Sequence, residues 1–173
     1  MSSFLESLSV LSWHVSPPPP DAEVPADLIS RYGQLPAELT AFLSSFSLCV
    51  CPSDKAWFVS TADLISNLPF RFNAFELMSL EAAGSDADWC AAIRSFWQSH
   101  FPLFLSVNGS YQYFAYCLQG PVRGQVVYGS EPEFEECSVV AHSLVDFLTM
   151  FSAAARSSAP AYPFSVAIPR SAG

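Results

Sequence analysis

The hydrophobic pattern changes its period after residue 100, and this change constrains the fold more than any other feature of the chain. Apolar residues alternate with a period of two over residues 103–107 and 111–118, on either side of Asn108-Gly109. Asn-Gly tolerates the positive φ angles of a type I′ turn, so the segment predicts a β-hairpin closed by that turn. A third strand is predicted over residues 125–128, which makes an antiparallel meander.

Helical spacing of apolar residues appears before and after this meander. It predicts a helix over residues 36–46, a helix capped by Asp86 or Asp88, and a last helix with Ser143 at its N-cap. The shorter predicted elements are an N-terminal helix carrying Phe4, Leu8 and Leu11, a helical turn ended by Gly33, strands over 48–51 and 56–59, and a brief helix over 61–65. Residues 69–83 receive no assignment. The order predicts an α+β fold: a single antiparallel β-sheet with helices packed mainly on one side.

Composition along the chain predicts three segments. Residues 1–27 are expected to form an N-terminal helix and a proline-rich linker containing Pro17, Pro18, Pro19 and Pro20. Residues 28–155 are expected to form the α+β domain. Residues 156–173 are rich in Ala, Ser and Pro, and we expect a loosely ordered tail there.

The charge of the chain excludes several classes of partner. Seven Lys+Arg against 16 Asp+Glu give a formal net charge of -9. Direct nucleic-acid binding needs Lys and Arg to displace counterions, and an anionic membrane would repel the chain, so neither partner is predicted. The longest charge-free run, residues 95–122, is interrupted by Pro102 and by Asn108-Gly109, which argues against a membrane span. The first thirty residues lack Lys and Arg, so a cytoplasmic protein is expected. The sequence leaves the oligomeric state open.

No motif for catalysis, cofactor binding or metal binding is recognisable. The five cysteines at positions 49, 51, 90, 117 and 137 are interpreted as small apolar residues of a reducing compartment. Cys49-Val50-Cys51 lacks the CxxC spacing of zinc and redox sites. We therefore predict no catalytic residue, no cofactor and no metal. A cysteine-dependent enzyme that pairs Cys51 with His100 or His142 stays open as an alternative.

An acidic stretch, residues 131–136, follows the meander and is called the acidic loop below. It contains Glu131, Glu133, Glu135 and Glu136, with Phe134 between them. One interpretation is a solvated loop whose Phe134 is tucked into the core. The other is a docking patch for a basic protein, with Phe134 as an apolar anchor, because complementary charge selects partners and speeds association.

Tyrosines on the hairpin are the second candidate for partner binding. Tyr111 and Tyr113 line one face of the predicted second strand. Tyr suits interfaces because a large apolar ring carries a polar tip. A sheet packed on both faces explains the same rings without a partner, so both interpretations remain.

The order of the motifs resembles that of the SMI1/KNR4 (SUKH) superfamily, over about residues 28–151. The matching segments are the helix start Leu35-Pro36-Ala37-Glu38-Leu39, the strand and helix region 56–68, the hairpin 104–118 about Gly109, the strand 125–128, and the closing helix start Ser143-Leu144-Val145-Asp146-Phe147-Leu148.

This resemblance implies an SMI1/KNR4-like α+β fold without catalytic residues. Bacterial members look like immunity proteins that bind and neutralise a cognate toxin, which is often a basic nuclease. The expected function is therefore non-enzymatic toxin neutralisation through Glu131, Glu133, Phe134, Glu135, Glu136, Tyr111 and Tyr113. Eukaryotic relatives resemble regulatory scaffolds, which leaves an adaptor as a further alternative.

Overall fold

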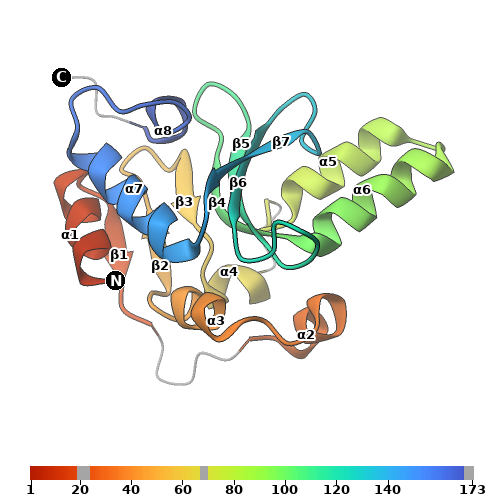
Figure 1. Ribbon diagram of the computed structural model, residues 1–173, viewed down its shortest axis with the longest axis horizontal. Coiled ribbons are helices and arrows are strands. Elements are labelled where there is room, and N and C mark those ends of the chain that lie inside the picture. Colours follow the sequence, from red (N-terminus) through yellow and green to blue (C-terminus); the bar gives the residue numbers. More distant parts are fainter. Residues whose placement is uncertain (19–23, 67–69, 170–173) are drawn as a thin grey trace.

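The computed structural model describes residues 1–18, 24–66 and 70–169 (Figure 1). Within them the chain forms eight helices and one seven-stranded sheet. The helices are α1 (Ser2–Val10), α2 (Ala26–Tyr32), α3 (Ala37–Leu43), α4 (Thr61–Ile65), α5 (Ala74–Ala83), α6 (Ala87–Ser99), α7 (Leu144–Arg156) and α8 (Phe164–Ala167). The strands are β1 (His14–Ser16), β2 (Leu48–Val50), β3 (Ala56–Phe58), β4 (His100–Ser106), β5 (Gln112–Cys117), β6 (Val126–Ser130) and β7 (Cys137–Ala141).

The sheet is a meander in which each strand pairs antiparallel with the next one in the chain. Its order is β1-β2-β3-β4-β5-β6-β7. The α+β class and the single antiparallel sheet are thus confirmed. The sequence did not predict β1, β7 or α5.

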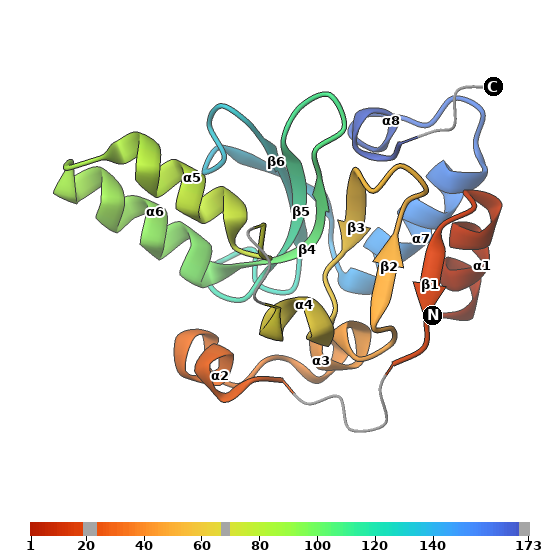
Figure 2. The ribbon, with the colours of Figure 1, turned by 180° about the vertical axis from the view of Figure 1, so that it is seen from behind.

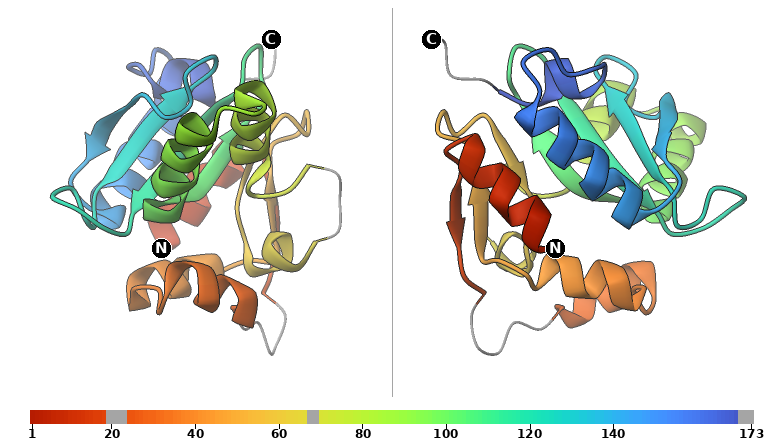
Figure 3. Two further views of the ribbon diagram at one scale, coloured as in Figure 1. Left: turned by 90° about the vertical axis from the view of Figure 1, so that its right-hand side faces the viewer. Right: turned by 60° about the vertical axis from the view of Figure 1, so that its left-hand side comes forward.

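One face of the sheet is covered by α1, α7 and α8 (Figure 3). Phe58 of β3 lies at the centre of this layer, with its ring 5.0 Å from that of Phe4 and 4.9 Å from that of Phe151. Further along the sheet, Phe114 of β5 packs against Phe147 of α7. This aromatic layer joins the first helix and the last long helix to the middle of the sheet.

The opposite face of the β4–β6 region is covered by α5 and α6, so helices lie on both faces of the sheet rather than mainly on one (Figures 1 and 2). Tyr113 of β5 packs here between Trp97 of α6, at 4.9 Å, and Phe75 of α5, at 6.3 Å. Every residue of β5 is buried, because apolar rings on both of its faces meet helices. The two helices project beyond the sheet as an antiparallel pair, and α2, α3 and α4 lie below it (Figure 2).

The central hairpin is confirmed, but the predicted type I′ turn is wrong. Ser106 pairs with Gln112, so the connection contains the five residues 107–111. Only Gly109 takes a positive φ, of 81°, whereas a type I′ turn needs two such residues. The irregularity between Pro102 and Phe104 lies in β4, where a proline cannot donate to the ladder.

The N-terminal segment belongs to the same folded body as the rest. β1 pairs with β2, and Ser7 of α1 donates a hydrogen bond to Ser152 of α7 at 3.3 Å. At the start of the predicted linker, the Pro17 carbonyl accepts a hydrogen bond from Ser47 Oγ at 2.8 Å. Residues 19–23, with Pro19 and Pro20, lie outside the described residues.

The C-terminal segment is ordered as far as it is described, contrary to the expected loose tail. Phe164 of α8 is buried and its ring stacks on Phe114 at 5.3 Å. Ala167 and Ile168 are also buried. The Ala/Ser/Pro-rich composition of residues 156–173 gave no sign that these three side chains are buried. Their burial holds the segment against the sheet.

Candidate protein-binding surface

The acidic loop connects β6 to β7 and is held in place by its neighbours on the sheet. Glu131 follows directly after β6, and its N–H donates to the carbonyl of Tyr111 at 2.9 Å. In return, the N–H of Tyr111 donates to Glu131 Oε1 at 2.8 Å. This reciprocal pair fastens the first residue of the loop to the start of β5.

A tyrosine that crosses the neighbouring strand fastens the middle of the loop. Tyr113 lies opposite Gly129 in the β5–β6 register, and its hydroxyl donates to the carbonyl of Phe134. Gly129 makes this path possible, since a Cβ there would lie 2.4 Å from the Tyr113 ring. Burial raises the pKa of Tyr113 well above its usual value, so the phenol keeps the proton that it donates.

Phe134 points into the protein. It is buried, and its ring stacks on that of Phe75 with a centroid distance of 4.7 Å and an interplanar angle of 6°. The interpretation of Phe134 as an exposed anchor is therefore wrong, and the core interpretation is correct. The side chain anchors the loop to α5 instead of anchoring a partner.

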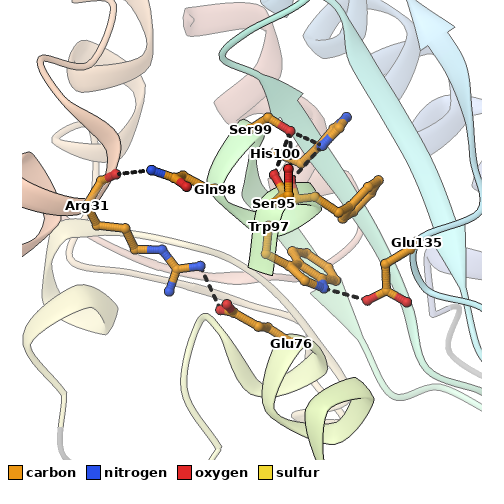
Figure 4. A network of polar contacts seen from close by, with 9 residues as sticks. Arg31, Glu76, Ser95, Trp97, Gln98, Ser99, His100 and Glu135 are labelled. Atoms are coloured by element: carbon orange, nitrogen blue, oxygen red, sulfur yellow. Dashed lines mark hydrogen bonds and ion pairs between the residues drawn. The ribbon is translucent and has the colours of Figure 1, made fainter. Parts of the chain in front are cut away.

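Glu135 is committed to an internal hydrogen bond. The indole N–H of the buried Trp97 donates to Glu135 Oε1 at 2.8 Å, and Figure 4 shows the two side chains meeting between α6 and the loop. Since Glu131 is occupied by Tyr111, two of the four carboxylates of the acidic loop serve its own structure. A charged acceptor strengthens such hydrogen bonds.

The other two carboxylates, on Glu133 and Glu136, are exposed. The N–H of Glu136 donates to the carbonyl of Glu133 at 3.1 Å, which makes these residues the two ends of one β-turn. The Cα atoms at the ends of a β-turn lie within about 7 Å of each other. The fixed loop therefore presents two neighbouring negative charges to solvent.

A groove of about 620 Å³ lies beside these charges, and we call it the acidic groove. The α5–α6 pair supplies its apolar wall through Met78, Ala82 and Trp89, and the acidic loop supplies the opposite wall. Trp89 is 49% exposed. Apolar spacing alone groups Trp89 with the buried Ile93, one turn further along α6, so the sequence does not identify Trp89 as a surface residue. That helix face loses its cover because the pair of helices projects past the sheet.

The two predicted tyrosines pack against Phe75 of α5. Tyr113 is fully buried, and Tyr111 is half-buried with its ring 5.7 Å from that of Phe75. Both sit under α5, which was not predicted. A sheet packed on both faces accounts for the buried Tyr113, whereas Tyr111 stays partly exposed and its contact with a partner stays a prediction.

The cysteines form no disulfide in the structure, and Cys49, Cys51 and Cys117 are buried. Burial raises the pKa of Cys117 to about 12, and it also raises the pKa of Cys49 and Cys137. These groups stay as thiols at neutral pH, which makes them poor nucleophiles.

The proposed partners of Cys51 are not at hydrogen-bond distance in the structure. Its Sγ lies 3.2 Å from Ser53 Oγ, whereas His100 Nδ1 contacts the Phe96 carbonyl and Ser99 Oγ. Among residues 1–18, 24–66 and 70–169, no three His, Cys, Asp or Glu side chains come together as ligands for a metal ion.

The same described part of the chain contains no helix that is both long and apolar enough to cross a bilayer.

Comparison with protein families and with curated proteins finds no match to this chain. Its function must therefore be argued from its own surface.

Proposed function

We propose that this chain is a non-enzymatic protein-binding protein that neutralises a cognate toxin with a basic surface, and that it acts in the cytoplasm. The net charge of -9 favours a basic partner and disfavours nucleic acid. The resemblance of its motif order to SMI1/KNR4 proteins supports toxin neutralisation as the purpose of binding. The contact of Cys51 Sγ with Ser53 Oγ instead of a histidine favours binding over cysteine chemistry.

The observation that carries this proposal is the set of internal contacts that hold the acidic loop. Internal contacts of Glu131, Phe134 and Glu135 fix its backbone, so Glu133 and Glu136 are held in place before any partner arrives. A partner then loses little conformational entropy in ordering this surface, which favours tight binding.

The direct test is co-expression of the full chain with the product of the adjacent gene. A stable 1:1 complex by size-exclusion chromatography with light scattering, together with growth protection when that product is toxic, is the expected result. Absence of a complex, or a complex without protection, would reject toxin neutralisation.

Charge reversal tests whether the acidic loop is the surface used. The double variant Glu133→Lys/Glu136→Lys should weaken the complex at least tenfold and lower its association rate, because rim charges govern encounter. Glu81→Lys, at an exposed position of α5 outside the acidic groove, makes a single reversal nearby and is the control. The control changes the net charge by +2 and the double variant by +4, so a control loss of binding free energy half as large as that of the double variant would point to net charge alone.

A further inference from the structure

The acidic groove joins two kinds of surface that are rarely left exposed together. Trp89 presents a half-exposed indole on the wall formed by α5 and α6. Glu133 and Glu136, the ends of one turn, stand on the opposite wall. An exposed indole favours a flat group of the ligand, and the neighbouring carboxylates favour a positive charge on it. Together they define the chemistry of the ligand.

The groove is preformed on both sides. The loop wall is fixed by the stacking of Phe134 on Phe75, which ties it to α5, and by the Trp97–Glu135 hydrogen bond, which ties it to α6. The helix wall is fixed because Ile93 and Trp97 of α6 are buried. These contacts position the helix that carries Trp89 opposite the loop that carries the two free carboxylates.

We propose that the acidic groove binds an arginine side chain of the protein partner. A guanidinium group is planar and weakly hydrated, so it stacks on an indole face, and its fork of N–H donors satisfies two carboxylate groups at once. A lysine ammonium supplies the same charge without the planar face or the fork. This inference rests on the proposed function for the identity of the partner. It adds that an arginine of the partner binds in the acidic groove, in contact with Trp89, Glu133 and Glu136.

Charge complementarity identifies the occupant. The acidic wall carries Glu133 and Glu136 with no internal partner among the hydrogen bonds and ion pairs described above, and the whole chain is at -9. A second copy of this chain would bring two acidic walls to one interface. A wholly apolar segment would leave both carboxylates desolvated and unpaired, which costs free energy. A basic segment with an arginine satisfies both walls.

The test uses hexa-arginine and hexa-lysine peptides as probes of the full chain, followed by backbone amide shifts in a nuclear magnetic resonance titration. We expect shifts centred on residues 78–90 and 131–136, and hexa-arginine binding about fivefold more tightly than hexa-lysine. Equal affinity for the two peptides, or shifts centred elsewhere, would overturn the proposal.

Variants assign the contribution of each wall. Trp89→Ala should weaken hexa-arginine about threefold to fivefold and leave hexa-lysine less affected. Glu133→Gln/Glu136→Gln should weaken both peptides, by about tenfold for hexa-arginine. Leu77→Ala and Glu81→Gln, exposed on α5 but outside the groove, are the matched controls. Unchanged arginine binding in the Trp89 variant would contradict the stacking.

The same variants separate this inference from the proposed function. If the adjacent gene product binds the wild-type chain and binds all groove variants equally well, the function stands and the arginine site is wrong. If that product does not bind but hexa-arginine behaves as expected, the arginine site stands and the toxin assignment is wrong.

Discussion

Gly129 is the residue on which the geometry of the acidic loop depends most directly. Its missing side chain leaves room for the Tyr113 ring to cross β6 and reach the Phe134 carbonyl. Positive φ plays no part here, because Gly129 is not among the glycines with that conformation. The requirement is one of space alone.

Gly129→Ala should therefore lower the free energy of unfolding by about 1–3 kcal/mol, as expected when a methyl group is forced into a packed site. Urea unfolding measures the loss. The same substitution in a Tyr113→Ala background should cost clearly less, because the ring that blocks the methyl group is gone. Equal costs in the two backgrounds would show that the ring is not the obstacle.

We expect His100 to make the free energy of unfolding depend on pH. Its ring stacks on Phe96 at 4.0 Å and its Nδ1 contacts the Phe96 carbonyl at 2.9 Å. Burial lowers the pKa of His100 below its usual 6.5. The folded state therefore binds the proton less readily than the unfolded state, so the stability that this histidine contributes is present above 6.5 and is lost as pH falls.

His100→Gln should accordingly flatten the decline of the free energy of unfolding between pH 7 and pH 5. Urea unfolding at several pH values measures the slope. His142→Gln, at an exposed position, controls for the loss of one imidazole. A slope that stays as steep in the His100 variant as in the wild type would rule out this origin.

Comparison of α7 with α5 explains which elements the sequence predicts. In α7 the apolar positions and the buried positions coincide at Leu144, Phe147, Leu148 and Phe151, and Ser143 Oγ accepts the N-cap hydrogen bond from Asp146 N–H. Local periodicity therefore suffices. In α6, with Asp86 at the cap, the two patterns agree at Ile93 and Trp97, whereas Trp89 on the same face is exposed.

In α5 the two patterns disagree. Glu76 and Ser79 are buried, whereas Leu77 is 49% exposed. Glu76 is buried because Arg31 of α2 pairs with it at 2.7 Å across 45 residues of sequence (Figure 4). No local pattern encodes a partner so far away in the sequence. Because α5 was not predicted, the burial of Tyr111, Tyr113 and Phe134 against it could not be predicted either. For the candidate site, the sequence thus identified the charged loop but not its anchors or its apolar wall.

Removal of Arg31 should show how this pair holds α2 to α5. Arg31→Met leaves the Glu76 carboxylate buried without its cation and should cost roughly 2 kcal/mol of unfolding free energy, more than Glu76→Met. The double variant should recover part of the loss, because the unpaired charge is then gone. Arg94→Met, exposed on α6, is the control.

A double variant no more stable than Arg31→Met would contradict the role of the buried charge. The exposure of the Arg31 side chain, 28% against 7% for Glu76, keeps the expected cost below that of a fully buried pair.

At the scale of the whole molecule, the terminal segments complete the core rather than flank it. Phe164 stacks against both Phe114 and Phe147, so the last described helix closes the aromatic layer beneath α7. The sequence did not predict this closure, since α8 has four residues and lies in an Ala/Ser/Pro-rich stretch.

Phe164→Ala should lower the free energy of unfolding by about 3 kcal/mol, the usual cost of removing a buried phenyl ring. Val166→Ala in the same helix, at a position that is 40% exposed, should change it far less. Thermal and urea unfolding of the two variants make the comparison. Similar, small effects in both would mean that α8 is dispensable.

The sequential strand order of the sheet determines the order in which its contacts can form during synthesis. Each strand pairs with the strand that precedes it in the chain, so the sheet can extend one strand at a time while the chain leaves the ribosome. Phe4 can meet Phe58 early in this process, but its contact with Phe151 has to wait until nearly the whole chain exists. α1 therefore completes its packing only after α7 has been made, and until then its apolar side lacks one of the surfaces that cover it.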